Sequence, residues 1–206
     1  GMTMSYTYTM TDAAFSSTSV MIDMGDMGSI GIGNSAGGAG IPAYDSVIPT
    51  AGEEVWDDVD TVDNGVVMHS KANAIEYNGT FGGFGVSAAY VNDGSGASSD
   101  SSMVLTYDGL MDGLSLGYGL GEDSVDEDLE TIFVKYTVGG ITAAFQRSEL
   151  DSAGTSSDQE SDAMGVSFAI NENLSISYGT HDVDFGAAGN ADEESAGVSA
   201  SYTMGG

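Results

Sequence analysis

The chain has 206 residues, with 31 Gly, only 2 Pro and no Cys, and its 32 acidic residues against 3 basic ones give a formal net charge of -29. The absence of Cys excludes disulfide scaffolds, thiolate zinc sites and cysteine catalysis, and the negative charge repels the phosphates of nucleic acids. No apolar run approaches the roughly 18 residues of a membrane-spanning helix, while 41% hydrophobic and 9% aromatic residues favour a folded chain.

Alternation of apolar with small or polar residues is the dominant pattern and predicts β-strands. In residues 114–121, for example, Leu114, Leu116, Tyr118 and Leu120 alternate with Ser and Gly. In chain order, strands are expected at residues 2–10, 17–25, 27–34, 66–81, 84–91, 101–109, 114–121, 130–138, 141–148, 162–170, 174–182 and 195–204. The sequence thus predicts an all-β, antiparallel up-and-down meander with residues 1–206 in a single domain.

Short and long connections alternate between these expected strands. The long ones span residues 11–16, 35–65, 92–100, 122–129, 149–161 and 183–194. Up-and-down strands place all connections of one kind on the same side of the sheet. Because most of the 32 acidic residues fall in the long connections, the two edges of the sheet are expected to face different environments.

The two faces of the expected strands favour a transmembrane β-barrel over a soluble β-sandwich. One face carries Leu, Ile, Val and Met in mid-strand with Tyr or Phe toward the ends, which is typical of a lipid-facing band with aromatic girdles. The other face is mostly Ser, Thr, Gly and Ala, with few charges, chiefly Asp23, Glu76 and Lys135. These small residues suit the wall of a water-filled lumen, and closure leaves no unpaired edge in the membrane.

A Gly-rich strand at residues 26–33 (DMGSIGIG) enters a long acidic segment, residues 34–65, that contains Asp, Pro and Trp. This region resembles the constriction loop of Gram-negative general porins, most closely alphaproteobacterial, marine-type members. Residues 77–90 and 199–206 are also similar to porin hairpins. The resemblance therefore covers nearly the whole chain.

The resemblance implies a sixteen-stranded outer-membrane barrel, a homotrimer when full-length, whose long third loop folds into the lumen. The family places this loop after the fifth strand, whereas residues 34–65 follow the third strand expected here. Two further strands are therefore expected before this chain and two after it, so that the chain is an internal piece of a porin. Membrane lipid and small hydrophilic solutes are the implied partners, with no cofactor and no enzymatic activity.

The predicted function is passive diffusion of small solutes and ions through a lumen narrowed by residues 34–65. The expected constriction residues are Asp45, Glu53, Glu54, Asp57 and Asp58. Carboxylates at a constriction favour cations over anions. The alternative is that the loop stays outside the lumen and its acids are merely solvated. Since only Lys135 among the three basic residues points inward by parity, the strong transverse field of many porins is not expected here.

Other interpretations remain open at this point. A secreted or surface-attached acidic β-sheet protein, such as an adhesin or lattice subunit, would also be rich in alternating strands. Two roles are open for the acids in the external connections: weak binding of Ca²⁺ or Mg²⁺, or a solvated surface without bound metal. These acids lack the spacing of a known calcium loop. His69 and His181 have no evident catalytic partner, and Trp56 either stacks on a solute or anchors its loop.

Overall fold

The computed structural model describes residues 1–11, 14–34, 38–55, 74–92, 99–123, 127–152, 158–186 and 192–204. The strands are β1 (Thr3–Thr11), β2 (Ala14–Asp23), β3 (Ser29–Asn34), β4 (Ala74–Phe81), β5 (Phe84–Val91), β6 (Asp100–Tyr107), β7 (Leu114–Glu122), β8 (Glu127–Val138), β9 (Ile141–Ser152), β10 (Gln159–Asn171), β11 (Leu174–Phe185) and β12 (Glu193–Tyr202). Two short 3₁₀ helices, η1 (Gly25–Met27) and η2 (Ile41–Tyr44), complete the described elements.

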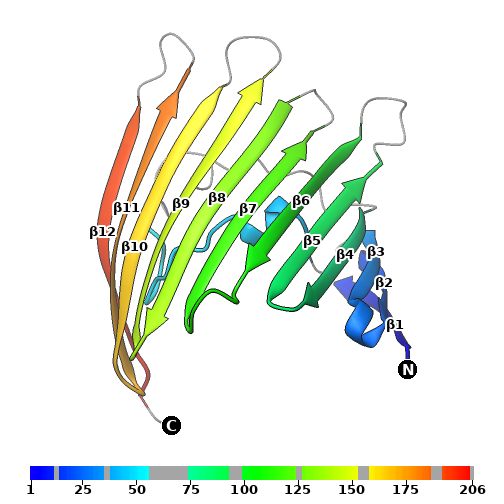
Figure 1. Ribbon diagram of the computed structural model, residues 1–206, viewed down its shortest axis with the longest axis horizontal. Coiled ribbons are helices and arrows are strands. Elements are labelled where there is room, and N and C mark those ends of the chain that lie inside the picture. Colours follow the sequence, from blue (N-terminus) through cyan, green and yellow to red (C-terminus); the bar gives the residue numbers. More distant parts are fainter. Residues whose placement is uncertain are drawn as a thin grey trace.

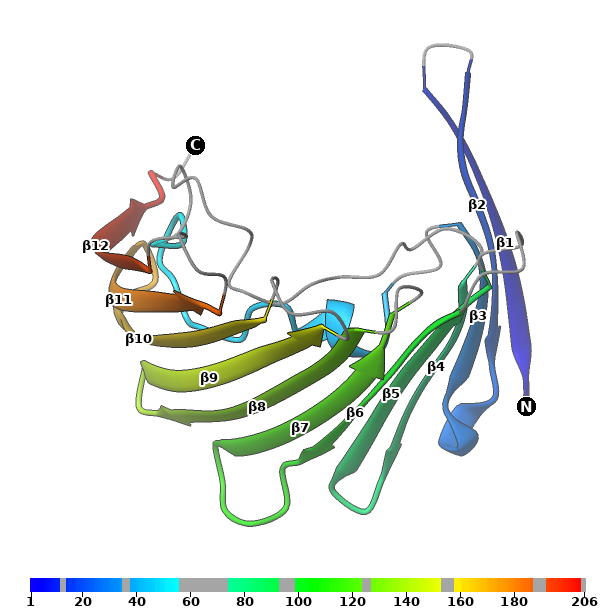
Figure 2. The ribbon, with the colours of Figure 1, turned by 90° about the horizontal axis from the view of Figure 1, so that it is seen from above.

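The strands form one antiparallel sheet in which each strand pairs with its neighbours in sequence, from β1 to β12. Figure 1 shows the strands as a continuous row, and Figure 2 shows that this row curves into an open trough with β1 and β12 at its two edges. The all-β, up-and-down prediction is therefore confirmed, although these twelve strands do not close into a barrel. None of the helices in the described segments has the length and apolar character needed to span a bilayer.

Two hairpins turn on paired glycines. Gly82 and Gly83 link β4 to β5 with φ angles of 58° and 87°, and Gly139 and Gly140 link β8 to β9 with 55° and 87°. A type I′ turn needs positive φ at both central residues, and its twist matches that of the flanking strands. These glycines therefore fix the register of both hairpins, in which Phe81 faces Phe84 and Val138 faces Ile141.

Several strands extend farther toward the long connections than the sequence predicts. β8 begins at Glu127 rather than residue 130, β9 ends at Ser152 rather than residue 148, and β10 begins at Gln159 rather than residue 162. The acidic residues there were expected in loops, yet the backbone ladder continues through them because its hydrogen bonds do not depend on side-chain type. The expected strand at 66–81 is described only from Ala74 onward.

The convex face of the sheet is apolar and open. Every strand carries at least one exposed large apolar side chain, as illustrated by Met4, Phe15, Ile32, Ile75, Tyr90, Leu105, Tyr118, Ile132, Ile141, Met164, Tyr178 and Val198. All described strands belong to the same sheet, so no second layer of strands among them covers this face. An exposed apolar band of this extent is what contact with acyl chains requires.

Inward-facing residues on β9 to β12 form cross-strand rows. One row consists of Ala144, Gly165, Gly179 and Gly197, which pair directly with one another in that order. The next row toward the short turns consists of Thr142, Ser167, Ser177 and Ser199. Because the first row has no side chain larger than a methyl group, it forms a strip of small residues across four strands. A line of hydroxyl groups lies beside this strip.

Candidate functional site

Residues 38–55 lie on the concave side of the sheet, against the inward-facing side chains of its strands. Figure 2 shows the segment, with η2 at its start, running along the inside of the curved sheet. Its hydrogen bonds extend from β4, at Glu76, to β11, at Ser177. The segment therefore spans most of the width of the sheet.

Polar side chains of the wall accept hydrogen bonds from the loop backbone. The N–H groups of Gly38, Gly40, Ile41 and Ala51 donate to Glu76 Oε1 (3.2 Å), Ser87 Oγ (2.9 Å), Ser102 Oγ (3.1 Å) and Ser177 Oγ (2.9 Å), respectively. A buried backbone donor without a partner costs about 1–3 kcal/mol. These acceptors therefore allow an irregular segment to lie against the sheet without leaving those N–H groups unsatisfied.

Gln146 on β9 binds the loop at two points. Its Oε1 accepts the N–H of Val47 at 3.1 Å, and its Nε2 donates to the carbonyl oxygen of Tyr44 at 2.7 Å. Nε2 also donates to Thr131 Oγ1 on β8 at 3.1 Å. The Gln146 side chain is only 3% exposed, so a single buried amide joins the loop to two strands of the wall.

Three apolar side chains of the loop, at positions seven residues apart, contact the wall where it has glycines. Ile41 is fully buried, and a Cβ atom at Gly119 would lie 3.2 Å from its Cγ1. Ile48 lies over Gly165 and Val55 over Gly179, where a Cβ atom would lie 2.6 Å and 3.0 Å from the nearest loop atoms, respectively. Glycine in mid-strand commonly marks such a close approach.

The loop and the wall enclose two small apolar cores between them. Around Ile41 one core contains Val104, Leu129, Phe133 and Leu150, with Tyr44 and Val47 packed against it. Around Ile48 the other contains Ala144 and Ala163, with Val47 and Val55 against it. Burying a side chain of this size contributes about 1.5–3 kcal/mol. The prediction that small inward residues chiefly border water is therefore incomplete, because many of them hold the loop.

The predicted constriction residues fall into two groups. Asp45 and Glu54 are half-buried and Glu53 is exposed, all on the inner loop. Asp57 and Asp58 lie outside the described residues. The Asp45 carboxylate accepts the N–H of Ser46 at 2.9 Å, which leaves its other oxygen available to solvent or solute. Negative charge thus accompanies the loop along the inner face.

The predicted wall residues differ in their surroundings. Asp23 is exposed at the short-turn end of β2, where its Oδ1 accepts the N–H of Gly25 at 2.8 Å. Glu76 is 3% exposed beneath the start of the loop. Lys135 is half-buried and pairs with Ala144 at one end of the glycine row. Of the three, Glu76 therefore holds the loop rather than standing free on the wall.

Tyr44 stacks on Phe133, with ring centroids 5.5 Å apart and an interplanar angle of 21°. This contact fixes the C-terminal end of η2 against β8. Burial raises the pKa of the Tyr44 hydroxyl above its ordinary value; a hydrogen bond with Thr106 partly opposes this rise, and the nearby charge of Asp108 adds to it. Tyr44 is therefore neutral at physiological pH and adds no charge to the inner face.

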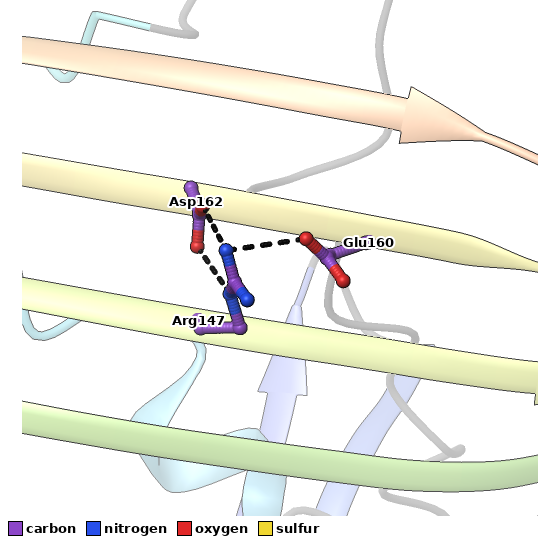
Figure 3. A network of polar contacts seen from close by, with 3 residues as sticks. All are labelled: Arg147, Glu160 and Asp162. Atoms are coloured by element: carbon purple, nitrogen blue, oxygen red, sulfur yellow. Dashed lines mark hydrogen bonds and ion pairs between the residues drawn. The ribbon is translucent and has the colours of Figure 1, made fainter.

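The single Arg faces outward from β9, at the boundary between the apolar band and a cross-strand row of acids. Arg147 Nε donates to Asp162 Oδ1 at 2.7 Å, and its Nη2 lies 3.2 Å from Glu160 Oε1 (Figure 3). In the adjacent row, Glu130, Glu149 and Glu160 stand directly opposite one another. Within the described ranges no group of three or more acidic or histidine side chains is placed to hold a metal ion.

The remaining residues singled out in the sequence contribute little to this site. His181 is 2% exposed on β11, within the strand that the sequence predicts at residues 174–182. It belongs to the inward-facing row that contains Ala163. Trp56, His69 and Lys71 lie outside the described residues.

Comparison with known proteins agrees with this architecture. A family model described as Gram-negative porin matches residues 3–206. A porin structure refined at 1.8 Å superposes with a TM-score of 0.65 at 15% identity, covering 100% of this chain and 82% of that one. OmpT, an outer membrane protein of Vibrio cholerae, gives a TM-score of 0.58 at 15% identity, covering 92% of this chain and 65% of that one. No curated protein sequence matches the chain.

The family match extends over nearly the entire chain. The curved meander, its apolar convex face and the inner loop fit that assignment. The family match in turn places the protein in the outer membrane, where it acts as a channel without enzymatic chemistry. The chain belongs to the Gram-negative porin family.

Proposed function

We propose that the protein allows passive diffusion of small hydrophilic solutes and ions, with a preference for cations, through an aqueous lumen narrowed by residues 34–65. The observation that carries this proposal is the inner loop itself. Its described part is bound to the concave wall, while Asp45, Glu53 and Glu54 keep partial or full access to solvent. Carboxylates in a narrow aqueous passage attract cations and repel anions.

The distribution of positive charge supports the same selectivity. Lys135 is the inward-facing cation among the described residues, and Arg147 faces outward with two carboxylates. The preference depends on ionic strength, because the Debye length falls from about 8 Å at 0.15 M salt to about 3 Å at 1 M. Cation selectivity is therefore strongest in dilute salt and modest at the ionic strength of seawater.

The test is the reversal potential of the native protein in planar bilayers under a salt gradient. We expect cation preference, reduced by the double variant Glu53→Gln/Glu54→Gln. The matched control is Asp112→Asn/Glu172→Gln, which removes two exposed acids from the short-turn edge and should leave the reversal potential near that of the wild type. Anion preference, or no conductance, would contradict the proposal.

We propose further that the native barrel closes through strands that pair with the free edges of β1 and β12, and that it assembles as a homotrimer. In hydrocarbon, unpaired backbone groups of an edge strand each cost several kcal/mol, which favours a closed sheet. The family resemblance supports the trimer. Cross-linking of the detergent-solubilised native protein tests the assembly, and a monomeric mass would contradict it.

A further inference from the structure

Gln146 uses nearly all the hydrogen-bonding capacity of its amide at the interface between loop and wall. Both hydrogens of Nε2 have acceptors, Tyr44 O at 2.7 Å and Thr131 Oγ1 at 3.1 Å, and Oε1 accepts the N–H of Val47 at 3.1 Å. Thr131 is held in turn by Ser148 Oγ at 3.0 Å. The amide is thus fixed from the wall side before it contacts the loop.

The two loop bonds also dictate the chemistry required at position 146. One partner is a carbonyl oxygen and the other an N–H group, so only a side chain with both a donor and an acceptor satisfies them. A carboxylate would place an oxygen against the Tyr44 carbonyl oxygen, and an aliphatic side chain would leave both loop groups unpaired. Both bonds go to backbone atoms and therefore define the path of the chain itself.

Asp45 and Ser46 lie between the two bonded residues. The backbone on either side of Asp45 is fixed, at the Tyr44 carbonyl and the Val47 N–H, by one side chain. The Asp45 carboxylate is held locally by the N–H of Ser46. The position of this charge relative to the wall therefore depends on Gln146, which need not touch a solute.

We propose that Gln146 is a positioning residue that sets where the Asp45 carboxylate stands in the lumen, and thereby the selectivity of the channel. The inference rests on the proposed function, because it assigns a role within the same constriction. Removing the side chain should increase the time that residues 44–47 spend released from the wall. We expect an increase of about tenfold, equivalent to about 1.4 kcal/mol, for the loss of both loop bonds.

The chain contains a matched control residue. Gln159 on β10 is also buried, at 7% exposure. Its Nε2 has no hydrogen-bond partner among the described residues. Gln146→Ala and Gln159→Ala therefore remove the same side chain from two buried wall positions, of which only the first is bonded to Tyr44 and Val47. Gln146→Glu and Gln159→Glu form a second pair that adds the same negative charge.

A spin label reports on the loop independently of ion flow. The chain has no Cys, so Asp45→Cys or Glu53→Cys provides a single labelling position. In Gln146→Ala we expect greater mobility of the label at position 45 and little change at position 53, which lies beyond the bond from Ala51 to Ser177. Gln159→Ala should change neither label. Unchanged mobility at 45, or an equal increase at both positions, would overturn the inference.

Bilayer recordings of the unlabelled native protein then test whether the position of the Asp45 carboxylate affects the preference for cations. We expect Gln146→Ala to have noisier open-channel current and weaker cation preference than the wild type and Gln159→Ala. A conducting, cation-preferring wild type with an unchanged reversal potential in Gln146→Ala would refute the role of Gln146 alone. A wild type without conductance would instead refute the proposed function, while the label mobilities would still decide whether Gln146 holds the loop.

Discussion

Ile48 of the inner loop occupies the space that a side chain on Gly165 would need, since a Cβ atom there would lie 2.6 Å from Ile48 Cγ2. Gly165→Ala should therefore push the loop away from β10. Overpacking of this kind costs about 1–3 kcal/mol. We expect faster cleavage of the folded protein by a glutamyl endopeptidase after Glu53 or Glu54, because cleavage requires local release of the loop.

A second substitution distinguishes this contact from a general defect. Ile48→Ala removes the overlapping methyl groups, so the double variant Ile48→Ala/Gly165→Ala should be cleaved more slowly than the two single effects predict. Residues in contact typically show coupling of about 0.5–3 kcal/mol. Additive effects would mean that Ile48 does not rest on Gly165 in solution.

Ser102→Ala should loosen the start of η2. Ser102 Oγ accepts the N–H of Ile41 at 3.1 Å in a buried setting, and a buried donor left without a partner costs about 1–3 kcal/mol. Amide hydrogen exchange at Ile41 should accelerate accordingly. Ser101 is the adjacent residue, is exposed, and faces the opposite side of β6, so Ser101→Ala serves as the control and should leave this exchange unchanged.

Arg147→Gln should lower stability more in dilute salt than in concentrated salt. The substitution removes the cation that contacts Asp162 and Glu160. In the part of the chain that the structure describes, it leaves the opposed row of Glu130, Glu149 and Glu160 without a nearby positive charge. Partly exposed ion pairs contribute about 0–1 kcal/mol, and salt screens them. Denaturation midpoints measured at low and high salt test this, and an equal loss under both conditions would argue against an electrostatic cause.

Alkaline pH should weaken the contact of Tyr44 with the wall. The pKa of Tyr44 is raised by burial, so the bound state prefers the neutral phenol more strongly than the released state does. Its contribution to loop binding is present in full below the ordinary value of about 10 and is lost as pH rises through the raised pKa. Protease sensitivity of the loop should increase over that range, and the increase should be smaller in Tyr44→Phe.

Strand positions were predictable from sequence because alternation reports directly on the two faces of a strand. The pattern at Leu114, Leu116, Tyr118 and Leu120 corresponds to β7, whose observed start is Leu114. Strand ends at the long connections were less predictable. Asp128 and Asp151 fall in connections expected from the sequence, yet they pair across β8 and β9. A polar side chain that faces water or headgroups does not interrupt a backbone ladder.

The candidate site was only partly predictable. The acids of the loop, such as Asp45 and Glu53, are visible as charges in a long connection, whereas the partners that hold the loop are far away in sequence. Gln146 lies 99 positions from Val47, and no local pattern links them. One signal was present, since Gly165 and Gly179 occupy inward positions in mid-strand, where glycine indicates the close approach of another segment.

The hydrogen bond between Ala51 and Ser177 spans 126 positions, whereas each strand pairs with the next strand in the chain. Sequential hairpins close short loops and form quickly, while contacts between distant residues form slowly. The inner segment is synthesised before β4, yet its binding surface is incomplete until β11 is in place. The inner segment therefore cannot make all of its contacts with the wall until strands that follow it in the sequence, up to β11, have formed.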